Sequence, residues 1–524
     1  MLIHVSIGWM LIFAAAGCSQ PVASRTAPPP PPAPESMKTV EAPAEVAAAP
    51  AAPTTGNSFV VGGPAGTITN LLGINQGPAP VGRGTADLTT LYQERGITTI
   101  RTHDYKGAFD LTDDNFKATD SVLAHIGAGG FSPYLRLGNS YGAGATMASK
   151  EELSKGMLDM LTHVQAGTDK ARPVQYVELW NEPDNKEFWT QGEDAYIAMY
   201  IEAAKAIRAK HPKVKIGGPA LTPAGALTDR GRGFVERFLA AVKAAGAPLD
   251  FITWHMYSND PAVYAAAAKT YRDASEKAGF GDLEQHVTEW NTAFKAEGGT
   301  PDGGPRPGGK GGEAGKRGDG QGKRGDGEGR RGDGQGKRGG GPGAGGGADA
   351  ELPADVAARL ADKHDTQVRI GARASALTTA EWIAMQVSGV DQAYFYRGPD
   401  PAPYPSSFYG MFYNDGRPKP AGLAALLWKR MVDHPTRISL SGPATGPIWA
   451  LAGRSPSGET TVLLANATAE PVVWDMPCPV GSVLPVQTTR LRAPAEALEV
   501  GTQPDCSGTL DAWEVRSLSW IGGA

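Results

Sequence analysis

Two glutamates stand at the ends of short apolar runs, where a strand can present a carboxylate rigidly. The first, Glu182, belongs to the run Glu178-Leu-Trp-Asn-Glu-Pro-Asp184, in which the proline cannot continue a strand ladder and so ends the strand. The second, Glu289, belongs to the run His286-Val-Thr-Glu-Trp-Asn291. A partly desolvated carboxyl keeps its proton to a higher pH than a solvated one, as a general acid requires. The two runs therefore indicate a site that works with paired carboxylates.

Other polar side chains gather at the ends of the apolar runs that we expect to be strands. In a barrel of parallel strands, the carboxyl ends open on one face, and active sites are built there. A chance distribution over the surface would scatter such residues. Those concerned are Asn75, Arg101, His103, Asp104, Arg136, Asn139, Asn181, His255 and Tyr257.

Eight β-like runs alternate with helical runs such as 194–210, 233–245 and 376–387. This alternation predicts a (β/α)8 TIM barrel. A doubly wound sheet is the alternative, but Gly73-Ile-Asn-Gln-Gly77 lacks the glycine-rich phosphate fingerprint typical of that fold. The predicted strands are 68–75, 97–103, 132–138, 174–181, 214–217, 249–257, 286–291 and 392–396.

The texture of the sequence changes after the barrel, which we expect to occupy residues 57–433. Short alternating segments split by Gly, Pro and Ser predict that residues 434–524 form a small C-terminal antiparallel β domain, sandwich-like in character. Cys478 and Cys506 both lie in it. An exported protein folds in an oxidising compartment, so we expect a disulfide between them, with two buried free thiols as the alternative.

The N-terminal segment predicts export. Residues 1–18 read as a signal peptide, with an apolar stretch too short to span a bilayer. Small residues before Cys18 resemble the lipobox of bacterial lipoproteins, so we expect lipidation of Cys18 and a place in the cell envelope. Ordinary secretion is the alternative. Residues 19–56 are rich in Pro and Ala, as in an extended tether.

A glycine-rich insert interrupts the predicted barrel over residues 298–348. It repeats a seven-residue unit without any apolar position, from Gly315 to Pro342, and such a composition predicts disorder. Basic side chains outnumber acidic ones in it. We interpret the insert as a tolerated expansion, with electrostatic steering of anionic glycans as the alternative.

Composition excludes several classes of protein. The chain has 524 residues and a net charge of −5, which argues against a nucleic-acid coat protein. No apolar stretch beyond the first twenty residues could span a membrane, so the only membrane contact expected is a lipid anchor. Three cysteines are too few for a cysteine-based zinc or iron–sulfur cluster. The oligomeric state stays open.

The two glutamate runs resemble those of the clan A retaining glycoside hydrolases. Within that clan the chain is most similar to glycoside hydrolase family 39, the β-xylosidase and α-L-iduronidase family. The resemblance covers about residues 66–430 and includes Arg101-Thr-His-Asp104 and Gly217-Gly-Pro219. It implies Glu182 as the acid/base, Glu289 as the nucleophile and Asn181 as a donor to the sugar 2-hydroxyl. Carboxyls about 5–5.5 Å apart give net retention through a covalent glycosyl-enzyme.

Several other residues are expected to bind the substrate, although each also has a structural interpretation as an ion pair or as part of the core. We expect at least one of Trp189, Trp290 and Tyr396 to stack on a sugar ring. Many clan members carry a tryptophan at the eighth strand end, where this chain has Tyr394-Phe-Tyr-Arg397. The expected substrate-binding residues are Asn181, His103, Arg101, Arg136, His255, Tyr257, Trp290 and Tyr396.

The sequence therefore predicts a retaining glycoside hydrolase that acts on an oligo- or polysaccharide, with a xyloside or uronide-type glycan favoured and no cofactor or metal expected. The alternative is a catalytically silent surface lipoprotein that binds glycans. A third hypothesis, adhesion through the Arg-Gly-Asp runs at Arg317, Arg324 and Arg331, leaves the paired carboxylates unexplained.

Overall fold

The computed structural model describes residues 57–79, 86–103, 105, 107–111, 116–138, 148–167, 173–292, 369–400, 409–442 and 446–522. The predicted signal peptide with Cys18, the linker and the glycine-rich insert lie outside these ranges, as do Asp104 and Asn139. Within the described ranges, no helix combines the length and the apolar character needed to cross a bilayer.

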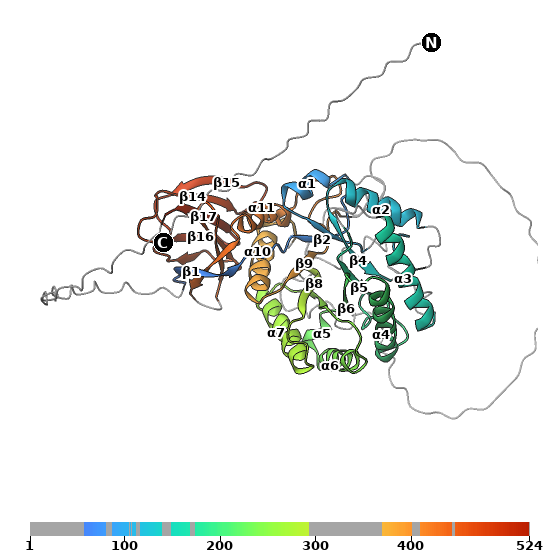
Figure 1. Ribbon diagram of the computed structural model, residues 1–524. Helices are drawn as coiled ribbons and strands as arrows, with labels where there is room; N and C mark the ends of the chain where they lie inside the picture. The colour runs from blue at the N-terminus through green and yellow to red at the C-terminus, as the bar shows by residue number, and fades with distance from the viewer. Residues whose placement is uncertain are drawn as a thin grey trace, which may run out of the picture. The chain divides into compact units, whose positions relative to one another are not determined.

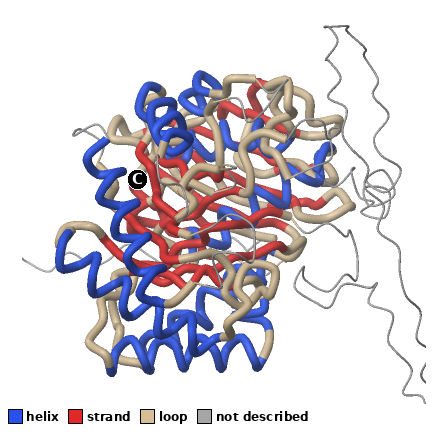
Figure 2. The backbone as a smooth tube through the Cα atoms, turned by 90° about the vertical axis from the view of Figure 1, so that its right-hand side faces the viewer, coloured by secondary structure: helices blue, strands red, loops and turns tan. Residues whose placement is uncertain are grey.

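Eight parallel strands close into a barrel, which confirms the predicted fold class (Figure 1). Each strand pairs with the next in chain order, and the last pairs with the first. Figure 2 shows strands in the interior with helices on the outside. Every observed barrel strand overlaps a predicted one. The strands are β2 Gly73–Asn75, β3 Thr99–Arg101, β4 Ser132–Leu137, β5 Tyr176–Leu179, β6 Lys215–Leu221, β7 Phe251–Tyr257, β8 Glu284–Asn291 and β9 Gln392–Phe395.

The barrel helices begin where the sequence supplies local start signals. Thr228 caps α6 by accepting a hydrogen bond from Gly231 N, and Asp260 followed by Pro261 starts α7, the arrangement that satisfies orphan amides at a helix start. The described helices are α1 Thr89–Glu94, α2 Lys117–Ala128, α3 Lys150–Gly167, α4 Glu193–Lys210, α5 Ala224–Leu227, α6 Asp229–Ala244, α7 Pro261–Lys277, α10 Ala372–Val387 and α11 Pro420–Val432.

Aromatic side chains fill the barrel interior near the amino ends of its strands. Tyr134, Phe251 and Tyr394 form a buried cluster, with Tyr176 packed against it. The ring of His286 stacks on Phe251 at 4.4 Å between centroids. These rings occupy the barrel interior at this end, and the polar side chains that follow the strands lie at the opposite end.

A second, antiparallel sheet follows the barrel in the chain and has its own core around Trp474, Leu464 and Trp520. Its seven strands lie in the order β1-β10-β11-β12-β17-β14-β15, and a two-stranded sheet pairs β13 with β16. The strands are β1 Val60–Thr67, β10 Thr436–Ser441, β11 Ile448–Arg454, β12 Glu459–Asn466, β13 Val472–Trp474, β14 Val486–Leu491, β15 Glu499–Gln503, β16 Gly508–Leu510 and β17 Val515–Ile521.

The β domain is not purely C-terminal, which corrects the predicted barrel boundary of 57–433. Strand β1 pairs with β10 and belongs to the β sheet, so the chain passes through this domain before entering the barrel. Cys478 and Cys506 are joined by a disulfide within it, with their Cα atoms 5.2 Å apart. Leu451, Leu463 and Val515 of this sheet belong to the same buried cluster as the barrel core.

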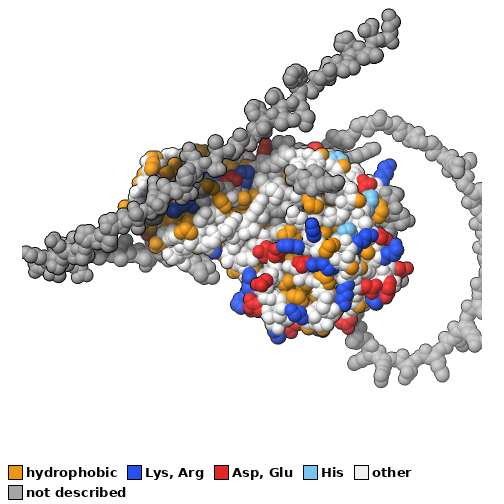
Figure 3. Space-filling model, viewed as in Figure 1, with side chains coloured by type: hydrophobic (Ala, Val, Ile, Leu, Met, Phe, Trp, Pro, Cys, Tyr) orange, Lys and Arg blue, Asp and Glu red, His pale blue; other side chains and the backbone are white. Residues whose placement is uncertain are grey.

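Charged side chains of both signs are interspersed over the barrel helices α4 to α7 on the face shown in Figure 3. Pairs such as Arg230 with Glu193 and Lys277 with Glu236 join neighbouring helices. Exposed pairs of this kind contribute little to stability. The ionic groups that matter for chemistry are the buried ones inside the barrel.

Candidate active site

Glu182 is held just beyond β5 by an unusual backbone path. Trp180 and Glu182 both adopt positive φ angles, of 79° and 46°, a region that non-glycine residues seldom occupy and that marks functional sites. The Glu182 amide donates to the carbonyl of Ala220, near the end of β6, at 2.9 Å. The chain therefore turns sharply before Pro183, and the carboxylate is fixed at the strand end.

Glu289 is brought opposite His255 by a shift in strand register. Trp254 on β7 lies opposite Val287 on β8, but the next pair is His255 with Glu289, so one β8 residue is skipped. Irregularities of this kind re-aim side chains next to active sites. As a result, His255 and Glu289 lie beside each other on neighbouring strands.

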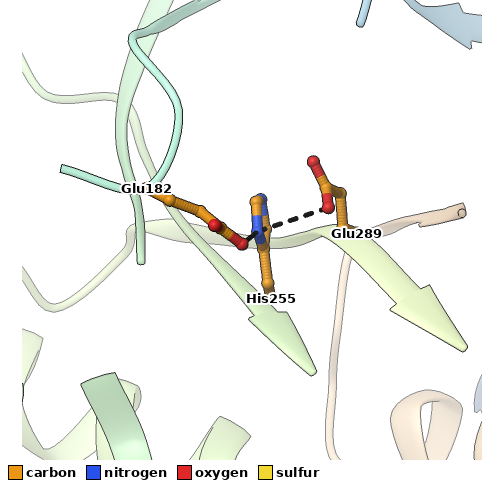
Figure 4. Close-up of side chains that lie close together, drawn as sticks. All are labelled: Glu182, His255 and Glu289. Atoms are coloured by element: carbon orange, nitrogen blue, oxygen red, sulfur yellow. Dashed lines mark hydrogen bonds and ion pairs between the residues drawn. The ribbon is translucent and has the colours of Figure 1, made fainter. Parts of the chain in front are cut away.

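The two glutamates face each other with His255 between them (Figure 4). One carboxylate oxygen of Glu182, one of Glu289 and a ring nitrogen of His255 all lie within 4.8 Å of one another. Retaining glycosidases hold their carboxyls about 5–5.5 Å apart, whereas inverting enzymes leave about 6.5–9.5 Å for a water molecule. The separation here corresponds to the shorter class.

The carboxylate of Glu289 is surrounded by donors. Arg101 Nη1 lies 2.8 Å from its Oε1, and His103 Nε2 lies 3.2 Å from the same oxygen. The hydroxyl of Tyr257 donates to Oε2 at 2.8 Å. These contacts fix the position of both oxygens of the Glu289 carboxylate and place a guanidinium beside it.

Arg101 connects Glu289 to three further residues of the barrel interior. It is fully buried and donates to Glu178 Oε2 at 2.7 Å, to Asn75 Oδ1 at 3.0 Å and to Asn181 Oδ1 at 2.7 Å. Burial alone would lower its pKa, but the charges of Glu178 and Glu289 outweigh burial and raise the pKa. Arginine can only donate, so the Asn181 oxygen faces Arg101 and its NH2 group is left as the donor for a ligand.

The pKa values of the two site histidines, His255 and His103, are shifted in opposite directions. Burial would lower the pKa of His255, but the charge of Glu289 and the hydrogen bond and charge of Glu182 raise it overall. For His103, burial lowers the pKa well below its usual value; Glu289 opposes this shift, while Arg101 and Arg136 reinforce it. Near neutral pH, His103 is therefore uncharged, whereas His255 retains a proton more readily.

Glu182 has contacts of a different kind. Its Oε1 lies 2.9 Å from His255 Nδ1, and its Oε2 accepts from Asn185 Nδ2 at 3.1 Å. Burial, together with the nearby charge of Glu182, raises the pKa of Asp184 to about 6, although hydrogen bonds from Thr222 oppose the shift. No guanidinium contacts Glu182 among the described residues, in contrast to Glu289.

Three tyrosines form an aromatic wall beside Glu289. Tyr257, Tyr396 and Tyr409 pack edge to face, with ring centroids 5.4 to 6.3 Å apart. The Tyr396 ring also lies 6.1 Å from that of His103. Tyr409 was not among the predicted residues, because it lies beyond the strands in a segment without apolar periodicity. Its position results from backbone pairing with Arg397, at the end of β9.

The structure does not bring every predicted residue into the cleft. Trp290 is fully buried and packs edge to face against Trp382 and Phe395, so its prediction as a substrate-binding residue is corrected to a core role. Trp189 is likewise buried, against Trp180. Arg136 is fully buried on β4, and its charge contributes to the lowered pKa of His103.

The atoms of Glu182, His255 and Glu289 are close enough to one another to reach a common cation. However, Arg101 already supplies a positive charge to Glu289, and the His255 nitrogen is directed at Glu182. A second cation would have to displace these contacts. The three residues are therefore better suited to acid–base and nucleophilic chemistry than to holding a metal ion.

The segment that carries the two glutamates is similar to known proteins. Residues 167–297, which contain both glutamates, match the family model of the glycosyl hydrolases family 39. The predicted resemblance to family 39 is confirmed over this segment. A β-xylosidase from Caldicellulosiruptor saccharolyticus is 30% identical over 133 residues, which are 22% of this chain and 25% of that protein. The chain thus spans about a quarter of the length of this curated relative.

Solved structures extend the likeness of the fold over most of the chain. A glucosidase from Croceicoccus marinus superposes with a TM-score of 0.61 at 18% identity, covering 89% of this chain and 99% of the other. A monomeric β-xylosidase from Caulobacter crescentus gives 0.60 at 15% identity, covering 89% and 100%. At such identities the likeness concerns the fold, including the barrel and its β domain.

Proposed function

We propose that the protein is a retaining glycoside hydrolase that works by double displacement. The observation that carries this proposal is the pair of carboxylates within 4.8 Å, one held by Arg101 and Tyr257 and the other by His255 and Asn185. Two carboxylates in unlike environments are what the chemistry needs, because one must attack and the other must donate a proton.

In the first step, an oxygen of Glu289 attacks the anomeric carbon as the bond from that carbon to the leaving oxygen breaks. Glu182 gives its proton to the leaving oxygen, so the aglycone departs neutral. Arg101 and Tyr257 hold the Glu289 carboxylate in place before attack. The product is a glycosyl ester of Glu289, with inverted configuration at the anomeric carbon.

In the second step, Glu182 is ionised and accepts a proton from water. The water oxygen attacks the same anomeric carbon, and the bond to Glu289 breaks. The second inversion restores the original configuration. Asn181 supports both steps in this proposal, because its oxygen is engaged by Arg101 and its NH2 group can donate to the sugar 2-hydroxyl.

A β-xyloside is the substrate that we favour. A curated β-xylosidase is 30% identical to this chain over 133 residues. A uronide stays the second candidate, since Arg397 closes β9 next to Tyr396 and is buried near the cleft. A guanidinium is the group that binds a sugar carboxylate in two-pronged fashion.

We also propose that the protein is exported and anchored through a lipid on Cys18. Small residues before this cysteine and the Pro- and Ala-rich tether after it support the proposal. Membrane fractionation of cells that express wild type and Cys18→Ala tests it. Wild type in the membrane fraction with a released variant is expected, whereas processed wild type found only in the medium would exclude an anchor.

The proposed activity is tested with a panel of aryl glycosides. Aryl β-xyloside, β-glucoside and uronide are supplied to wild type and to Glu289→Gln, and the first-formed anomer is followed by proton NMR. We expect turnover of the β-xyloside with the β anomer formed first, and none by the variant. Sugar binding without turnover would instead support a silent glycan-binding protein.

A further inference from the structure

A third carboxylate, Glu178, lies inside the barrel beneath the two glutamates of the proposed mechanism. It is fully buried on β5, where it lies in register with Arg136 on β4 and Gly217 on β6. Its Oε2 accepts from Arg101 Nε at 2.7 Å. Arg101 therefore links Glu178 to Glu289, because it contacts both carboxylates.

Stability does not explain a carboxylate in this position. Removing an ion pair from water costs more than a hydrophobic replacement of the same size, so a buried pair is weak support for a stabilising role. The other oxygen of Glu178, Oε1, has no hydrogen-bond partner among the described residues, which adds to the cost. A group retained under such conditions points to a functional requirement.

The contacts of Arg101 indicate what Glu178 is required for. Arg101 contacts Glu289, Asn181 and Asn75 as well as Glu178. Without Glu178, Glu289 would be the only carboxylate in contact with Arg101 among the described residues. A nucleophile held by unbalanced positive charge is stabilised in its ground state and attacks more slowly.

We propose that Glu178 is a positioning residue that holds Arg101 and balances its charge. In this role it keeps Glu289 reactive, orients the amide of Asn181 through Arg101 and sets the pH range of the reaction. The inference rests on the proposed function and goes beyond it, because Glu178 touches neither substrate nor reacting atoms.

Other titrating groups around Glu178 cannot take over this role. Burial raises the pKa values of Tyr134, Tyr196 and Tyr394 well above their usual value, with the charge of Glu178 contributing. Burial lowers the pKa of His286, against the opposing effect of Glu284. These groups therefore stay neutral near pH 7, which leaves Arg101, Arg136, Glu182, His255 and Glu289 as the charges that Glu178 influences.

The test is the pH dependence of kcat/KM for Glu178→Gln, which keeps an acceptor oxygen for Arg101 and removes the charge. Losing a negative charge favours the ionised forms of both Glu289 and Glu182. We expect both limbs of the bell-shaped profile to move to lower pH by about one unit, the size of effect that one near charge has. We also expect kcat to fall about tenfold, because a Glu289 carboxylate that is over-stabilised by Arg101 attacks more slowly; one pKa unit corresponds to a tenfold change in an equilibrium constant.

Two further variants separate charge from structure. Glu381→Gln is the matched control, because Glu381 is an equally buried glutamate on α10 outside the site, and its profile should follow wild type. Glu178→Asp keeps the charge on a shorter side chain, so kcat should fall while the limbs stay within a few tenths of a unit. This variant decides the question if Glu178→Gln does not fold.

The outcomes are distinct. Limbs that coincide with wild type in a folded Glu178→Gln, or limbs that move equally in Glu178→Asp, would overturn the charge-balancing role while leaving the proposed function intact. A wild-type protein that turns over none of the glycosides would overturn the proposed function, and the inference with it.

Discussion

His255 and Glu182 are joined by a hydrogen bond of 2.9 Å between Nδ1 and Oε1, and the same nitrogen lies only 3.6 Å from Glu289 Oε2. The Nδ1 atom of His255 thus lies close to both carboxylates. The negative charge of Glu289 is the leading cause that raises the pKa of His255 against burial. In the proposed mechanism, ester formation at Glu289 removes that charge, so His255 would hold its proton less firmly at the stage where Glu182 acts as a base.

Replacing His255 tests this coupling. The His255→Asn variant removes a group that is readily protonated beside two carboxylates, so their ionised forms lose a favourable partner. We expect the acidic limb of kcat/KM to move to higher pH, opposite in direction to Glu178→Gln, and kcat/KM at the optimum to fall about tenfold to a hundredfold. The measurement is a pH–rate profile with an aryl β-xyloside; an unmoved acidic limb would contradict the coupling.

Asp184 should set the alkaline side of the profile. Burial raises its pKa to about 6, so it becomes charged as the pH rises through that value and then helps nearby Glu182 to retain its proton. In Asp184→Asn this help is lost, and we expect the alkaline limb to move to lower pH by up to about one unit. The acidic limb should move less. An alkaline limb that shifts upward would contradict this assignment.

Glu381 should make stability depend on pH. It is fully buried, neither carboxylate oxygen has a hydrogen-bond partner among the described residues, and burial raises its pKa well above its usual value. The folded state therefore holds the proton more tightly than the unfolded chain. Its contribution to the free energy of unfolding is complete below about pH 4.3, the pKa of a glutamate in the unfolded chain. The contribution is lost as the pH rises through the pKa that Glu381 has in the folded state.

The Glu381→Gln variant removes this dependence. We expect it to unfold like wild type near pH 4 and to be more stable than wild type at pH 8, where the buried Glu381 favours unfolding. Denaturant unfolding at the two pH values measures the difference. Equal stabilities at pH 8 would show that Glu381 is solvated or paired in solution.

Tyr396 and Trp290 should respond differently to truncation. Tyr396 is partly exposed in the aromatic wall. Trp290, a residue of β8, is fully buried against Trp382 of α10. For Tyr396→Ala we expect KM to rise about tenfold with little change in melting temperature, since ring stacking on a sugar is lost. For Trp290→Ala we expect a loss of about 3–5 kcal/mol of stability. A higher KM in a still stable Trp290→Ala would return Trp290 to the cleft.

The barrel could be predicted from the sequence because eight β-like runs alternate with helical runs, and most of the β-like runs end in polar residues. The same logic placed Glu182, Glu289, Arg101, His255 and Tyr257 together, and the structure brings these side chains together. The position of Trp290 was also within reach. Successive strand residues face opposite sides, so an inward Glu289 requires an outward Trp290.

Other features depend on long-range pairing that no local pattern encodes. Strand β1 has no apolar alternation and is defined by its partner β10. The register shift that sets His255 opposite Glu289 is a property of two strands together. Tyr409 reaches the site only because its segment folds back along Arg397. In each case the determining partner is far away in the sequence.

Covalent trapping tests the central claim of a Glu289 nucleophile most directly. A 2-deoxy-2-fluoro β-xyloside with a good leaving group forms the glycosyl ester but slows its hydrolysis, and mass spectrometry of proteolytic peptides locates the label. We predict loss of activity in step with one added fluoroxylosyl group on Glu289, and no label on Glu289→Gln. An active wild type that carries the label on Glu182, or that is inactivated without any label, would contradict the account.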